Sequence, residues 1–139
     1  MNVDIENGGK LEIGKFLMTK GPLYFKSIGN GKLEIGNNVF FNHNCSLTVM
    51  EYIKTGNNSM FGNNLVIVNH NHLSENDIYE NKYVTDSIIL GNNAWWGTNV
   101  TILKEVTIGD NAVITVGFVA NRDVSVNEIC GGIPAKKIK

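Results

Sequence analysis

A six-residue repeat constrains the fold of this chain more than any other feature of its sequence. Between Leu90 and Ser125 the chain divides into consecutive units whose first position is mostly large and apolar, whose second is often glycine, and whose fifth is small or apolar. Side chains alternate between the two faces of a strand, so the fifth position and the first position of the next unit face the same way. These two positions must therefore face a core.

The repeat predicts a parallel β-helix. Three short strands joined by three corners make one coil of about 18 residues, and each coil stacks on the one before it. Residues 18 apart then lie above one another, as Leu90 and Ile108 or Trp96 and Ile114. The 15 glycines and the many asparagines suit tight corners, because both residues readily adopt the left-handed backbone conformation. We therefore predict an all-β triangular prism.

The 139 residues fit one domain, which we expect to span 1–139. The frame is less regular in the N-terminal coils at 1–34. It is interrupted at 73–83, which we interpret as a loop that leaves the coil, because long insertions in a periodic fold are usually functional or disordered. A C-terminal tail at 127–139 leaves the period.

Composition excludes several classes of protein. Twelve lysines and arginines face 13 aspartates and glutamates, and the net charge of −1 gives no footprint for binding nucleic acid. No apolar run approaches the roughly 20 residues of a membrane helix, and the N-terminus has no secretory pattern. We expect no membrane insertion and a cytoplasmic protein. Cys45 and Cys130 have neither disulfide-framework nor metal-ligand spacing.

Three segments carry a resemblance to a known family. The tract 90–102 reads Leu-Gly-Asn-Asn-Ala-Trp-Trp-Gly-Thr-Asn-Val-Thr-Ile, 106–110 reads Val-Thr-Ile-Gly-Asp, and 132–136 reads Gly-Ile-Pro-Ala-Lys. Over about residues 35–139 the chain resembles the hexapeptide-repeat acyltransferases, and within them the sugar O-acetyltransferases of the maltose, galactoside and capsular-polysaccharide type. The resemblance implies left-handed winding, acetyl-CoA as co-substrate, a sugar or glycan acceptor, and a homotrimer with its active sites between subunits.

The same resemblance assigns the catalytic residues. Of the three histidines, His72 aligns with the family's general base, and Thr98 matches a position that stabilises the oxyanion. An imidazole is largely neutral near pH 7 and can take the proton of an attacking hydroxyl. The frame places His70 and His72 outward and Asn71 inward. We expect direct transfer in a ternary complex, without an acyl-enzyme.

Coenzyme and acceptor contacts also follow from matching positions. The residues expected to contact the coenzyme are Trp95, Gly97, Thr98, Val116 and Gly117, with Lys136 and Lys139 near its phosphates. The residues expected to contact the acceptor are Asn42, Asn44, Glu51, His70 and Trp96. Trp96 stands at an inward position where the family usually has isoleucine, so its indole either widens the coil locally or turns into the acceptor pocket.

Three other functions remain possible at this point. An amino-sugar N-acetyltransferase would use the same base on an amine, so the residues do not separate it from an O-acetyltransferase. A non-catalytic β-helix would share the fold and bind no coenzyme. A β-helical zinc enzyme would need three histidines from different coils, whereas two of the three here are only two positions apart. We expect no metal.

Overall fold

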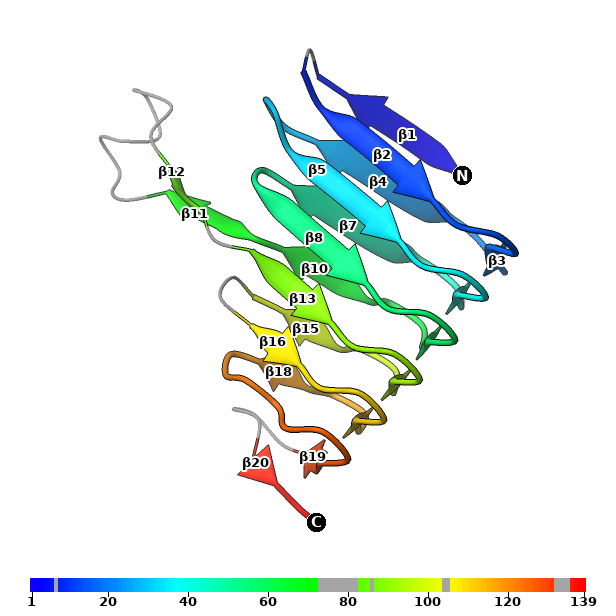
Figure 1. Cartoon of the computed structure of the whole chain (residues 1–139), viewed down its shortest axis with the longest axis vertical. Coiled ribbons are helices and arrows are strands. Elements are labelled where there is room, and N and C mark those ends of the chain that lie inside the picture. The colour runs from blue at the N-terminus through cyan, green and yellow to red at the C-terminus, as the bar shows by residue number, and fades with distance from the viewer. Residues whose placement is uncertain (7, 73–82, 86, 104–105, 132–135) are drawn as a thin grey trace.

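The structure, a computed structural model, describes residues 1–6, 8–72, 83–85, 87–103, 106–131 and 136–139. The chain winds into a prism whose three sides are parallel sheets, and Figure 1 shows its stacked coils turning left-handed. The predicted all-β, left-handed parallel β-helix is therefore confirmed. No helix within these ranges is long and apolar enough to span a membrane.

Each side of the prism is one sheet. Sheet A contains β1 (Asn2–Ile5), β4 (Leu23–Ser27), β7 (Cys45–Val49), β10 (Val66–Val68), β15 (Thr101–Ile102) and β18 (Val119–Ala120). Sheet B contains β2 (Lys10–Ile13), β5 (Lys32–Ile35), β8 (Tyr52–Thr55), β13 (Ile88–Leu90) and β16 (Thr107–Ile108). Sheet C contains β3 (Met18–Thr19), β6 (Phe40–Phe41), β9 (Met60–Phe61), β14 (Trp95–Trp96), β17 (Val113–Ile114), β19 (Ile129–Gly131) and β20 (Lys136–Lys137).

The coils differ in length along the prism. In the C-terminal half Leu90 pairs with Ile108, which confirms the predicted spacing of 18. In the N-terminal half Lys10 pairs with Lys32, 22 positions later, because the strands there are longer: β4 and β7 have 5 residues where β15 has 2. The N-terminal coils are thus longer than the repeat predicts, but they pair in continuous register.

The inward positions form one apolar core that contains a column of aromatic rings. Phe41 stacks on Phe61 with ring centroids 4.8 Å apart, and Phe61 stacks on Trp96 at 5.5 Å. Trp96 is 1% exposed, and its Nε1 finds no hydrogen-bond partner among the described residues. Of the two placements predicted for Trp96, the structure shows the inward one. Its side chain packs in the core, because stacking on Phe61 and burial hold the indole inside the coil.

The chain leaves the prism after β10. β11 (His70–His72) pairs antiparallel with β12 (Tyr83–Thr85), and together they form a ribbon that projects from the stacked coils (Figure 1). The predicted inward coil position of Asn71 is wrong, because β11 and β12 form a separate sheet outside the three sides of the prism. Of the predicted loop 73–83, all but Tyr83 lies outside the described residues.

The last coil extends into the predicted tail. β19 pairs with β17 in parallel, so the coil continues to Gly131, and β20 then folds back antiparallel on β19. In this coil the buried Glu128 accepts hydrogen bonds from Ser125 N (3.0 Å) and Arg122 Nη2 (2.8 Å). The Arg122 guanidinium and the Ser125 N–H hold the pKa of the Glu128 carboxyl below its usual value.

This lowered pKa predicts how stability depends on pH. A carboxyl with a depressed folded-state pKa stabilises the fold above its unfolded pKa, and that contribution is lost as the pH falls through the folded pKa. We expect Glu128→Gln to lower the melting temperature by a few degrees at about pH 7, and the difference from wild type to shrink below about pH 4. Circular dichroism melts across this range test it. An undiminished difference in acid would contradict the prediction.

Candidate functional site

A groove follows the corner that joins sheet C to sheet A. It encloses about 190 Å³, and its lining residues are Phe40, Asn42, Met60, Phe61, Gly62, Trp95, Trp96, Gly97, Thr98 and Val116. The structure therefore brings together four of the predicted coenzyme residues, Trp95, Gly97, Thr98 and Val116. Asn42 and Trp96, predicted for the acceptor, line the same groove.

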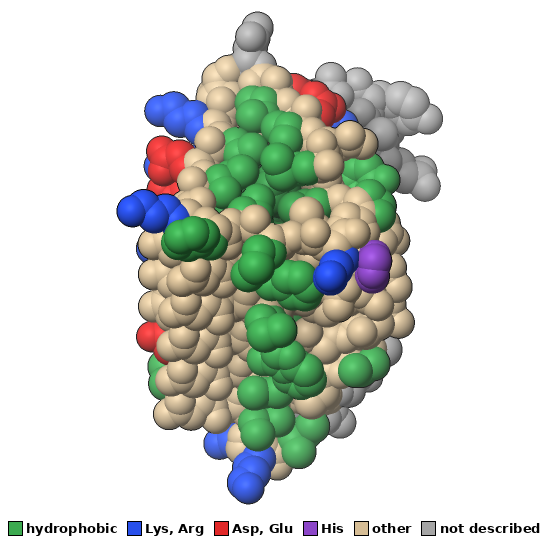
Figure 2. Space-filling view, turned by 90° about the vertical axis from the view of Figure 1, so that its right-hand side faces the viewer, with side chains coloured by type: hydrophobic (Ala, Val, Ile, Leu, Met, Phe, Trp, Pro, Cys, Tyr) green, Lys and Arg blue, Asp and Glu red, His purple; other side chains and the backbone are tan. Residues whose placement is uncertain are grey.

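One wall of the groove belongs to a strip of exposed or half-buried apolar side chains. Met18, Phe40, Met60 and Trp95 stand in one register column on the outer face of sheet C, and Figure 2 shows hydrophobic side chains running the length of this face. Trp95 is 49% exposed and Met60 50%. Phe40 and Met60 were not predicted. The signal that reveals them is their sixth position in the repeat unit, which they share with Trp95.

Close contact between two coils shapes the groove floor. A Cβ on Gly97 would lie 2.7 Å from Val116 N, so only glycine fits there. Gly117, with φ of 80°, donates its N–H to the Thr98 carbonyl at 2.9 Å. We predicted that Val116 and Gly117 offer backbone groups to the coenzyme. The Gly117 amide is already engaged, and Val116, 64% exposed, presents its side chain at the groove.

The two asparagines predicted for the acceptor occupy different places. Asn42 lines the groove, and its Oδ1 accepts the His43 N–H at 2.9 Å. Asn44 is not among the groove residues. Its Nδ2 donates to Asn64 Oδ1 at 2.9 Å, and Asn64 Nδ2 donates to Asn99 Oδ1 at 2.8 Å, so Asn44 begins an asparagine ladder along the corner. The φ of about 60° at Asn44 explains asparagine there without a ligand.

The predicted phosphate-binding lysines lie at the end of sheet C. Lys136 belongs to β20, which pairs with β19, and Lys139 is exposed, with its N–H donating to the Ile129 carbonyl at 3.1 Å. The Lys136 side chain lies outside the described part of the structure. Two strands, β19 and β17, separate β20 from the strand that carries Trp95.

Of the predicted site residues, His70, His72 and Glu51 lie at a different corner, the one that joins sheet A to sheet B. The ribbon that carries His70 and His72 leaves the prism here, and the exposed Glu51 lies between β7 and β8 on the preceding coil. The side chains of His70 and His72 lie outside the described part of the structure. In Figure 1 the ribbon projects from the side opposite β3 and β19 of sheet C. The structure thus separates the predicted base from the groove.

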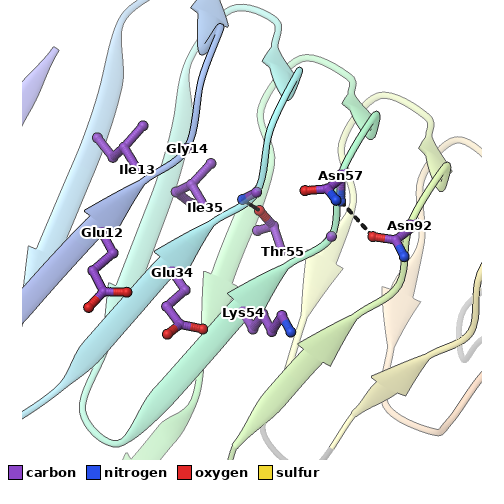
Figure 3. Close-up of a pocket in the computed structure, with 11 residues that line it drawn as sticks. Glu12, Ile13, Gly14, Glu34, Ile35, Lys54, Thr55, Asn57 and Asn92 are labelled. Carbon is purple, nitrogen blue, oxygen red and sulfur yellow. Dashed lines mark hydrogen bonds between the residues drawn. The ribbon is translucent and has the colours of Figure 1, made fainter.

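A larger concavity, of about 440 Å³, lies on sheet B (Figure 3). Glu12 and Glu34 line it from neighbouring coils, beside Lys54. Lys32 Nζ lies 2.9 Å from Glu34 and 3.7 Å from Glu12. The Tyr52 hydroxyl also donates to Glu34, and Tyr52 and Lys32 together lower the pKa of this carboxyl. Because its carboxylates pair with neighbouring donors and it contains no predicted residue, we place the candidate site at the smaller groove.

Metal ligands do not gather at either concavity. Within the described ranges, no group of three or more histidine, cysteine, aspartate or glutamate side chains has the arrangement of a metal site. The two cysteines are buried in the core, and burial raises the pKa of both thiols.

Known proteins that resemble this chain in sequence and fold are hexapeptide-repeat and sugar acetyltransferases. The chain is 29% identical over 128 residues to the galactoside O-acetyltransferase of Escherichia coli K12, a match that covers 91% of this chain. A hexapeptide-repeat acetyltransferase from Vibrio cholerae superimposes with a TM-score of 0.82 at 25% identity, covering 92% of this chain and 72% of the other. A galactoside acetyltransferase solved with coenzyme A gives 0.79 at 27% identity, covering 94% and 64%. The predicted resemblance to this family is confirmed.

The chain spans 62% of the length of the curated galactoside O-acetyltransferase that it matches. No family model matches the sequence.

Proposed function

We propose that the protein transfers the acetyl group of acetyl-CoA to a hydroxyl of a sugar or glycan acceptor. The observation that carries this proposal is the groove, which gathers Trp95, Gly97, Thr98 and Val116 beside exposed apolar side chains suited to a pantetheine arm. Likeness to a galactoside O-acetyltransferase, and to one solved with coenzyme A, supports both the donor and the acceptor class.

The proposed reaction is a direct transfer. His72 takes the proton of the acceptor hydroxyl while that oxygen attacks the thioester carbonyl. The C–O bond forms, the C–S bond breaks, and the proton passes from His72 to the departing thiolate. Thr98, which faces the groove, would donate to the oxyanion; losing one such donor typically costs about 3 kcal/mol of transition-state stabilisation.

The proposed assembly is a homotrimer in which two copies complete each active site. Within one chain the groove follows the corner from sheet C to sheet A, whereas His72 lies on the ribbon at the corner from sheet A to sheet B. One copy therefore supplies His72 and Glu51, and its neighbour supplies the groove. Closed symmetry is the usual arrangement of such head-to-tail contacts.

An acceptor screen tests the function. Purified protein is incubated with acetyl-CoA and acceptors that carry either free hydroxyls or free amines, and thiol release is recorded, with a coenzyme A binding titration in parallel. We expect saturable binding and release with hydroxyl acceptors. Release with amines alone would replace the O-acetyltransferase by an N-acetyltransferase. Absence of coenzyme A binding would reject the enzyme.

A further inference from the structure

We infer that Asn69 is a positioning residue, which fixes where β11 leaves the prism and so holds His70 and His72 in place. The inference deepens the proposed function, because it concerns the segment that carries the proposed base. Asn69 is the residue immediately before β11, and it is the last residue before the backbone enters the ribbon.

The side chain of Asn69 joins two coils. It is 0% exposed, although asparagine is usually found at the surface. Its Oδ1 accepts the Met50 N–H at 2.8 Å, and its Nδ2 donates to the Tyr52 carbonyl at 3.4 Å. Met50 and Tyr52 flank Glu51 at the turn between β7 and β8, on the preceding coil. One buried amide therefore ties the base of the ribbon to the corner of the preceding coil.

This coil needs such an anchor because its corner is interrupted. One coil nearer the N-terminus, the chain passes from β4 to β5 through a short connection, where Ser27 Oγ donates to the Gly31 carbonyl at 2.6 Å. After β10 the chain instead departs into β11 and returns through β12 before β13 begins. The corner is therefore not closed by a local turn of its own. The hydrogen bonds of Asn69 take that place, three residues before His72.

The chemistry of the amide makes the role specific. Asn69 needs both an acceptor for Met50 N and a donor for the Tyr52 carbonyl. Alanine removes both groups and leaves a buried N–H without its partner. Aspartate keeps the size and the acceptor, but it turns an oxygen toward the Tyr52 carbonyl. Small displacements of a catalytic group by about 1 Å can cost about 100-fold in rate.

The test uses Asn69→Ala and Asn69→Asp, with Ser27→Ala as the matched control. Ser27 is also buried, at 3% exposure, and also closes a corner between sheets A and B, but its coil carries no ribbon. The first readout is the NMR signals of the imidazole carbon-bound protons. The chain has three histidines, and His43, at another corner with Nδ1 3.0 Å from the Gly21 carbonyl, serves as an internal reference.

We expect the His70 and His72 signals to shift in both Asn69 variants while the His43 signals stay in place, and Ser27→Ala to move none of them. We also expect kcat for acetyl transfer to fall about 10- to 100-fold in Asn69→Ala, with KM for acetyl-CoA unchanged. Asn69→Asp keeps the shape of the side chain and carries the test if the alanine variant does not fold.

The outcomes separate this inference from the proposed function. Unmoved His70 and His72 signals, or an equal loss of kcat in Ser27→Ala, would overturn the role of Asn69. Shifted signals in a protein that neither binds coenzyme A nor transfers acetyl groups would uphold the positioning role and reject the acetyltransferase.

Discussion

Replacing His72 by alanine is expected to lower kcat for acetyl transfer by about 10²- to 10⁴-fold, the range that general-base groups contribute. The acceptor hydroxyl is a poor nucleophile until its proton is removed, and the variant leaves only water to remove it. Coenzyme A affinity should not change, because the variant retains every residue that lines the groove. Thiol release at saturating substrates measures the first quantity, and a binding titration measures the second.

The two other histidines serve as controls for this variant. His43→Ala should keep kcat within about twofold of wild type, since His43 is neither on the ribbon nor among the groove residues. His70→Ala should lose less than His72→Ala, because His70 stands two positions away on the same strand. A full rate in His72→Ala with a collapse in His70→Ala would move the base to His70. Ping-pong kinetics would instead contradict the direct transfer.

The sequence predicts the prism because two short periods act together. Alternation along each strand sets which residues face inward, and the six-residue unit sets where the corners fall. The longer N-terminal coils obscure the second period without breaking the first. The repeated Lys-Leu-Glu-Ile segments illustrate this, because Leu11 and Leu33 pair at inward positions although they are 22 residues apart. An even number of added residues keeps every side chain on its own face.

The exit of the ribbon could not be predicted in the same way. Asn69 and Asn71 are two positions apart, so strand alternation alone would place both side chains inward. The neighbouring residues do not distinguish the two positions. What places β11 outside the prism is its pairing with β12, where Asn71 faces Val84 across the ribbon. Such a contact joins residues separated by a segment without repeat character. Asn69 was missed because asparagine in this chain usually marks a corner, whereas here its amide is buried and bonded to the preceding coil.

Part of the site was predicted from the family resemblance. Another part was predicted neither from the resemblance nor from the repeat. Trp95 and Thr98 came from matching family positions, and the structure places both at the groove. Phe40 and Met60 share the sixth position of the repeat unit with Trp95, but stacking of the coils is what places the three side chains side by side. Trp96 shows that the inward position in the repeat decides the placement of the side chain even when that side chain is large. The aromatic column of the core accommodates the indole.

Mixing two inactive variants in one oligomer should restore acetyl transfer, if each active site draws on two copies. His72→Ala removes the base and keeps the groove. Val116→Trp fills the groove from an exposed position, 64% accessible, and keeps His72. In a mixed trimer of either composition, about one third of the sites pair an intact groove with an intact His72 from the neighbour. We therefore expect the purified mixed trimers to show about a third of wild-type activity, from two proteins that are each nearly inactive alone.

Co-expression with two different affinity tags, followed by purification on both, isolates the mixed oligomers for the assay. Oligomers of two differently tagged His72→Ala chains provide the control and should stay inactive. The single-chain alternative requires the ribbon to reach around its own prism from the corner between sheets A and B to the corner between sheets C and A. In that case every site carries the one lesion of its own copy, and no mixture recovers activity. If mixed oligomers are confirmed and activity is not recovered, each active site takes its His72 and its groove from one copy of the chain.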